Sequence, residues 1–207
     1  MSGCDPSGTG NVYTGRPSRT SMREADDAPT EAPPGTGEEL EASADIHKDA
    51  WSQTIDDMEA MGDELEDDGW DVVTVITADT APEAPDVGDD DRWGLVHVVP
   101  DNFADEFRSA VERGEFPRFD LFRAEAEGRI FHVTQLLDPE TETAILVAGN
   151  FLRRRADGLV RTARDEGEMY THARTLAGEH LGSFRHDDYE KFFPEADRLV
   201  ELGDDEP

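Results

Sequence analysis

The chain has 207 residues and carries 50 acidic side chains against 19 basic ones, a formal net charge of −31 at pH 7. Such an acidic chain argues against nucleic-acid binding, which needs basic side chains to replace the counterions of the phosphates. The sequence holds one cysteine and no run of 18 apolar residues. We therefore expect no internal disulfide, no cysteine-ligated metal and no membrane-spanning segment.

Two regions of different composition divide the chain. Residues 1–42 are rich in Gly, Pro, Ser, Thr and acidic residues and almost lack large apolar ones, which predicts a disordered acidic leader. The chain starts without the charged and apolar segments of a secretory signal, so we expect a cytoplasmic location. Residues 43–203 show regular apolar patterns over a length that suits a single α+β domain.

The first half of this domain alternates predicted helices and strands. Apolar residues at spacings of three and four predict a helix that begins after an N-cap at Ser43 and ends at Gly69. Strands are predicted at 70–76 and 93–99, separated by a loop rich in Pro and Asp over 79–91. A short helix is then predicted from Asp101 to Gly114, with its phenylalanines turned inward.

A meander of three strands is predicted next, over 119–126, 129–137 and 143–151. The dipeptide Glu127-Gly128 and the Asp-Pro-Glu-Thr sequence over 138–141 have the chemistry of tight turns. Strands joined by short turns pair antiparallel.

The sequence of the last third of the chain predicts helical structure. Apolar or small residues keep helical spacing without a break from Leu152 to Leu181, so one long C-terminal helix is expected, with a close contact at Gly167. The alternative is a pair of helices broken at Gly167. The fold class that follows is a two-layer α+β domain, with a mostly antiparallel sheet of about five strands and helices packed on one face.

Histidines provide the first candidate site. His97 and His132 both lie in predicted strands, and His97 shares its strand face with apolar residues. If the two faces meet, the pair can form a metal site or an acid–base pair. The alternative is that each is a structural histidine. His172, Glu179 and His180 are a further candidate set, but on one helix they lie two turns apart, which is too far to share one metal.

A cluster of arginines provides the second candidate site. Guanidinium groups suit carboxylate or phosphate ligands, so the cluster can bind an anion or a partner. The alternative is pairing with the acidic residues that follow at four-residue spacing on the same helix. The cluster consists of Arg153, Arg154, Arg155, Arg161 and Arg164.

Motifs of known catalysts are missing from the sequence, which has no nucleophile elbow, phosphate-binding loop or dinucleotide-binding glycine triad. We therefore expect no cofactor and favour a non-catalytic protein-binding or assembly module, with another protein or a second copy as partner. The alternative function is a small metal-assisted hydrolase that uses His97, His132 and nearby carboxylates.

The composition resembles that of cytoplasmic proteins of extremely halophilic archaea, because acidic residues abound and only Lys48 and Lys191 are lysines. The chain looks like a member of an uncharacterised haloarchaeal family with no assigned activity. This resemblance implies a protein that works in concentrated salt, where the Debye length falls from about 8 Å to about 3 Å. It implies no particular site residues.

Overall fold

The computed structural model describes residues 37–86 and 92–194. Most of the predicted leader therefore lies outside the described residues. The elements in chain order are α1 (Gly37–Asp67), β1 (Asp71–Ile76), β2 (Asp79–Glu83), β3 (Gly94–Val99), α2 (Asp101–Arg113), β4 (Arg118–Ala126), β5 (Arg129–Asp138), β6 (Thr143–Leu152), the 3₁₀ turn η1 (Arg153–Arg155), α3 (Asp157–Glu166), β7 (Met169–Thr175), β8 (His180–His186) and the 3₁₀ turn η2 (Tyr189–Lys191).

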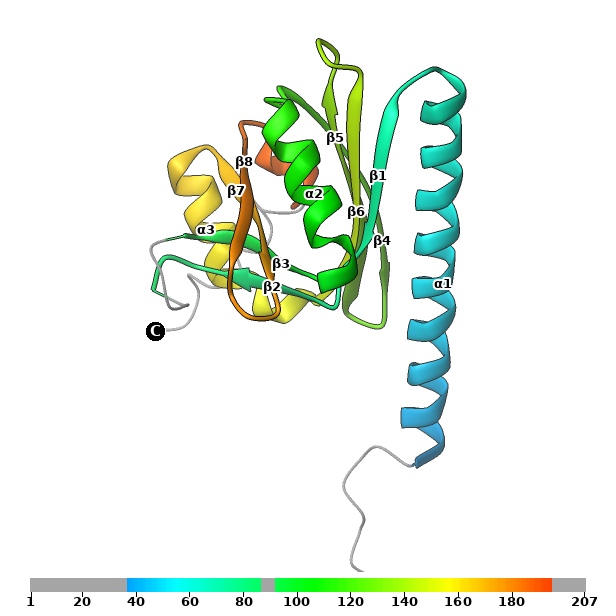
Figure 1. Cartoon of the computed structure of the whole chain (residues 1–207). Coiled ribbons are helices and arrows are strands. Elements are labelled where there is room, and N and C mark those ends of the chain that lie inside the picture. The colour runs from blue at the N-terminus through cyan, green and yellow to red at the C-terminus, as the bar shows by residue number, and fades with distance from the viewer. Residues whose placement is uncertain (1–36, 87–91, 195–207) are drawn as a thin grey trace, which may run out of the picture. The chain divides into compact units, whose positions relative to one another are not determined.

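Two four-stranded sheets form the centre of the domain (Figure 1). The first sheet has the strand order β1-β6-β5-β4 and the second has the order β2-β3-β7-β8. In each sheet one pair is parallel, β1 with β6 and β3 with β7, and the other pairs are antiparallel. The parallel pairs join segments that lie far apart in the sequence.

Helix α1 covers the outer face of the first sheet (Figure 1). Its apolar stripe packs there through Met58, which contacts the cluster formed by Ala144, Leu146 and Ala148 of β6. The opposite face of the helix is solvent-exposed and acidic. The stripe that predicted this helix is thus the surface that binds it to the sheet.

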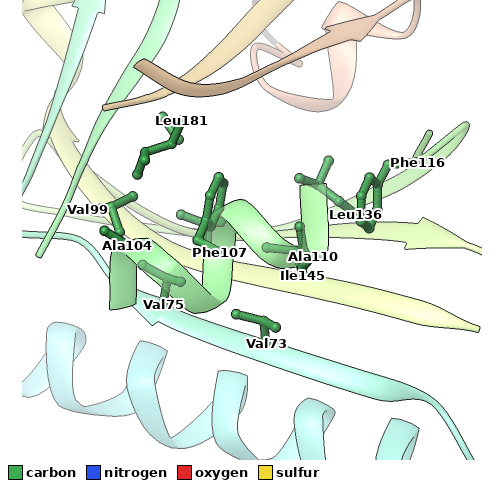
Figure 2. Packing of buried hydrophobic residues seen from close by; sticks show 12 residues of the cluster. Val73, Val75, Val99, Ala104, Phe107, Ala110, Phe116, Leu136, Ile145 and Leu181 are labelled. Atoms are coloured by element: carbon green, nitrogen blue, oxygen red, sulfur yellow. The ribbon is translucent and has the colours of Figure 1, made fainter. Parts of the chain in front are cut away.

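The core lies between the two sheets and has two apolar clusters. Helix α2 inserts Phe107 and Ala110 against Val73 and Ile145 of the first sheet in one cluster (Figure 2). Helix α3 forms part of the other cluster, which contains Leu95, Ile130, Phe151, Leu159 and Met169. Both clusters draw residues from both sheets, so the sheets pack face to face.

The predicted fold class is wrong. The described residues form eight strands in two mixed sheets rather than about five strands in one sheet, and the long helix is the N-terminal α1, with 31 residues. The segment predicted as a long C-terminal helix contains η1, α3, β7 and β8. Helices also cover more than one face of the sheet layers, because α1 lies outside the first sheet while α2 packs into the core.

The wrong prediction of a long C-terminal helix has two causes, the glycine at position 167 and a change in the spacing of the buried residues after it. Gly167 adopts a φ of 73° and its N–H bonds to Ala163 O, which ends α3 after ten residues. From Met169 onward the buried residues include Met169, Thr171 and Ala173, at the spacing of a strand. The alternative prediction placed the break correctly at Gly167, but a β-hairpin follows rather than a second helix.

Strand β2 forms where the sequence predicts a loop, because this segment contains Pro82 and acidic residues. It lies at the edge of the second sheet, where a proline removes no necessary ladder bond. Its antiparallel pairing with β3 therefore comes from tertiary structure rather than from its own strand propensity.

Candidate functional site

The structure brings His97 and His132 together in the core. His97 lies on β3 and His132 on β5, in different sheets, and their ring centroids are 5.5 Å apart. The side chains are 3% and 2% exposed, respectively. The faces that had to meet for a shared site do meet, and the metal or acid–base role of the pair stays a prediction.

These rings belong to a polar layer between the two apolar clusters. On β3, His97 stands between Leu95 of one cluster and Val99 of the other. On β7, Thr171 stands between Met169 and Ala173 in the same way. The layer consists of Thr77, Thr80, His97, His132, Thr134, Thr171 and His186, all of which are buried.

Gly149 on β6 makes room for this layer. It pairs with His132 across the first sheet. A Cβ atom at this position would lie 2.5 Å from Thr80 Oγ1 and 2.9 Å from His132 Cε1. The absence of a side chain therefore allows the threonine and the imidazole to occupy the same level of the core.

A hydrogen-bond chain fixes the tautomer of His97. Thr77 Oγ1 donates to the carbonyl of Ala148 at 2.9 Å, so its oxygen must accept from Thr80 Oγ1 at 3.2 Å. Thr80 then accepts from His97 Nδ1 at 3.1 Å. Because each hydroxyl has one hydrogen, Nδ1 carries the proton of the neutral ring and Nε2 keeps a lone pair.

Burial keeps the rings of this layer neutral. Loss of solvation, with a smaller contribution from His172, lowers the pKa of His97 to about 4. Burial likewise holds the pKa of His132 well below its usual value, and His97 and Arg123 add to that effect. Neutral imidazoles are the form that binds metals, so the protonation states suit a metal site at neutral pH.

Several polar atoms of the layer have no hydrogen-bond partner within the described residues. They are His97 Nε2, both ring nitrogens of His132, Thr134 Oγ1 and His186 Nδ1. A void of about 10 Å³ touches His97, Thr134 and Thr171, which is the volume of roughly one water molecule. A void of this size suits an internal water and excludes an organic substrate.

The hydrolase alternative requires a carboxylate beside the strand histidines. Within the described part of the chain, no group of three or more His, Cys, Asp or Glu residues is placed to hold a metal. The buried carboxylates of Glu83 and Asp138 are engaged elsewhere, the first by Arg174 and the second by the backbone N–H groups of Glu115 and Glu140. The geometry therefore favours a structural role for the polar layer over hydrolysis.

The arginine cluster is spread over η1 and α3. Arg153 Nε lies 3.6 Å from Glu125 on β4, and Arg161 donates to the carbonyl of Asp157. Arg154 and Arg155 are exposed. Arg155 lines a hollow large enough for a ligand, which places one predicted residue beside a candidate site.

That hollow is a groove along β2. It has a volume of about 470 Å³ and lies between β2 with its following residues and the start of α3. Its apolar lining includes Ala81, Pro82, Ala84 and Leu159. Three exposed charged residues complete it: Asp79 and Asp86 on the β2 side and Arg155 on the η1 side.

A smaller hollow of about 40 Å³ lies on the outer face of the second sheet. It is lined by His172 of β7 and His180 of β8, among others. The predicted helix separated these residues by two turns, whereas the hairpin brings both rings to the hydroxyl of Ser183, at 2.7 and 2.8 Å. Glu179 is not part of this group and binds Arg108. The alternation of Met169, Thr171 and Ala173 was the sequence signal for this strand.

Comparisons with known proteins place the domain in a family. Neither the curated proteins nor the solved structures include a match to the chain. No helix of the described part has the length and apolar character needed to cross a membrane. The model of one protein family matches residues 37–194, which is most of the chain. The chain therefore belongs to this family, which is a family of unknown function (DUF7529).

Proposed function

We propose that this domain is a binding module that takes an extended segment of a partner protein into the groove along β2. The observation that carries the proposal is the groove itself, with about 470 Å³ beside the outermost strand of the second sheet. A strand at the edge of a sheet leaves one row of backbone N–H and C=O groups unpaired within that sheet. An extended segment can pair with that row except at Pro82, whose nitrogen carries no hydrogen.

The lining of the groove defines the chemistry of the partner. Apolar side chains such as Ala81, Pro82 and Leu159 can contact alternate apolar residues of an extended segment. Asp79, Asp86 and Arg155 are exposed, and none of the three has an ion-pair partner among the described residues. A segment that carries basic residues for the two aspartates and an acidic residue for Arg155 complements these charges.

The test uses four blocked hexapeptides in which valine alternates with lysine, with glutamate, with both, or with serine. Binding to the full chain is measured by calorimetry at low and at high KCl concentration. We expect the mixed-charge peptide to bind most tightly, and more weakly at high salt. Equal affinity for all four peptides would overturn the proposal.

A pair of variants locates the binding. Ala81→Trp fills the groove, and we expect it to weaken binding of the mixed-charge peptide by at least about tenfold. Leu176→Trp adds the same side chain at a position that is 81% exposed outside the groove lining, and it should leave binding unchanged. If Ala81→Trp instead abolishes self-association and no peptide binds, the occupant is a second copy and the extended-segment assignment is wrong.

We also propose that the protein works in the concentrated salt of a haloarchaeal cytoplasm. The support is the net charge of −31 and the presence of only two lysines, since electrolyte screens the repulsion between carboxylates. Circular dichroism during thermal unfolding across a KCl series tests this. The unfolding midpoint should rise with KCl, and a midpoint that is highest in dilute buffer contradicts the proposal.

A further inference from the structure

We propose that His172 and His180 form a binding site for a divalent transition-metal ion such as Zn²⁺, Ni²⁺ or Cu²⁺ on the outer face of the second sheet. The two residues stand on the adjacent strands β7 and β8, which lie side by side in Figure 1. Neither residue belongs to the polar layer in the core, and neither lines the groove along β2.

The strand register brings the two rings together. His172 lies directly opposite Ser183, while a bulge after Ala173 places His180 opposite Arg174. His172 Nδ1 is 2.7 Å from Ser183 Oγ, and His180 Nε2 is 2.8 Å from the same oxygen. Two imidazole nitrogens thus converge on one hydroxyl. A rotation of the exposed His180 side chain can bring its Nε2 to a metal held by His172 Nδ1, at about 2.0–2.1 Å from each nitrogen.

Hydrogen bonds hold His172 in the tautomer that a metal needs. Its Nε2 is 2.9 Å from the carbonyl of Trp93, which can only accept. In the neutral ring, Nε2 therefore carries the hydrogen and Nδ1 presents its lone pair toward Ser183. A metal-binding histidine commonly donates its other N–H to a backbone carbonyl in this way, which fixes the orientation of the ring. The ring of Tyr170 stacks on His172 at 5.9 Å and 6° and supports the same orientation.

The second ligand, His180, is open to solvent. His180 and Ser183 are exposed, whereas His172 is buried to 7% exposure. With Nδ1 of His172 accepting, Ser183 donates to it and accepts from His180 Nε2. Metal binding requires the exposed His180 to move its proton to Nδ1, and water in contact with the ring can mediate that exchange.

The charge of the surrounding hollow decides which ions bind. Glu83, Arg92 and Arg174 line it together with the two histidines, and Arg174 lies 3.4 Å from Glu83. The two guanidinium groups outnumber the single carboxylate, so charge alone gives no affinity for a cation. Nitrogen ligands must supply it, so ions that prefer imidazole should bind and Mg²⁺ or Ca²⁺ should not.

The test is a calorimetric titration of the metal-stripped full chain with Zn²⁺ in excess Mg²⁺, which occupies carboxylates on the acidic surface. We expect one equivalent of Zn²⁺ to bind, and we expect His180→Ala to lower the affinity for Zn²⁺ by at least about tenfold. Glu179→Gln is the matched control, because it removes a carboxylate next to His180, and it should change binding less than about twofold.

Three results would overturn the proposal. One is the absence of stoichiometric Zn²⁺ binding by the wild-type chain. Another is a His180→Ala variant that binds Zn²⁺ as tightly as the wild type. The last is loss of the metal in His132→Asn with retention in His180→Ala, which would assign it to the buried pair. Because His180 is exposed, its substitution is compatible with folding, and circular dichroism checks that the variant is folded.

Discussion

Two pairs of histidines, one in the polar layer and one on the outer face of the second sheet, lie in different surroundings. His97 and His132 lie between two sheets, where a threonine chain holds the ring of His97 and the ring of Phe151 packs against that of His132. His172 and His180 meet at an exposed hydroxyl beside a hollow. The same imidazole is a structural group where the core encloses it and a candidate ligand where solvent and ions can reach it.

The largest effect is expected from acid acting on the polar layer of the core. The pKa of His97 is lowered to about 4 and that of His186 to about 3, mainly by burial, against about 6.5 in the unfolded chain. Protons therefore bind the unfolded state preferentially. The free energy of unfolding is therefore highest above pH 6.5. It decreases as the pH falls toward 4, by about 3 kcal/mol for His97 alone.

Denaturant unfolding between pH 7 and pH 4.5 checks this expectation. His97→Asn is the comparison, since it removes the most central of these groups and should flatten the pH dependence of the free energy of unfolding. A wild-type slope equal to that of His97→Asn would mean that the ring is hydrated in the folded state.

The next largest effect is expected at the glycine beneath the polar layer. Gly149→Ala places a Cβ within 3 Å of both Thr80 and His132, so the free energy of unfolding should fall by about 2 to 3 kcal/mol. Gly158→Ala is the matched control, because its Cβ would meet only Ala84, at 3.2 Å. Equal unfolding midpoints for the two variants would show that the layer is loosely packed.

A smaller effect is expected when one hydroxyl group is removed from the polar layer or from the outer face of the second sheet. Thr80→Val leaves the Nδ1–H of His97 unpaired in the core and should cost about 1 to 2 kcal/mol. Ser183→Ala removes a similar bond to His172 at an exposed position, where water replaces the hydroxyl, and should cost less than about 0.5 kcal/mol. Thermal unfolding of both variants measures the difference, and a larger loss for Ser183→Ala would reverse the comparison.

Local patterns in the sequence predicted many elements correctly. The apolar stripe around Met58 predicted α1, β-branched runs predicted β1 and β3, and turn chemistry at Glu127-Gly128 predicted the β4–β5 hairpin. These signals depend on residues close together in the chain, where propensity and periodicity act.

The remaining features depend on contacts that are distant in sequence. The strand β2 has the composition of a loop and forms because β3 pairs with it. The hairpin of β7 and β8 contains alanines that fit either period, so helical spacing was a misleading guide there. The histidine positions were visible in the sequence, but the meeting of His97 with His132 requires the two-sheet arrangement, and the Ser183 bridge requires the β7–β8 hairpin.

The parallel pairing of β1 with β6 also has a consequence for synthesis of the chain. Val73 has Ile145 as its partner, and β3 in turn needs β7, from Thr171 to Thr175. Neither sheet can be completed while the ribosome still holds the last third of the polypeptide. Because contacts of such sequence separation slow folding, nascent α1 and β1 must wait with their apolar surfaces uncovered, and this interval is when a chaperone would be most useful.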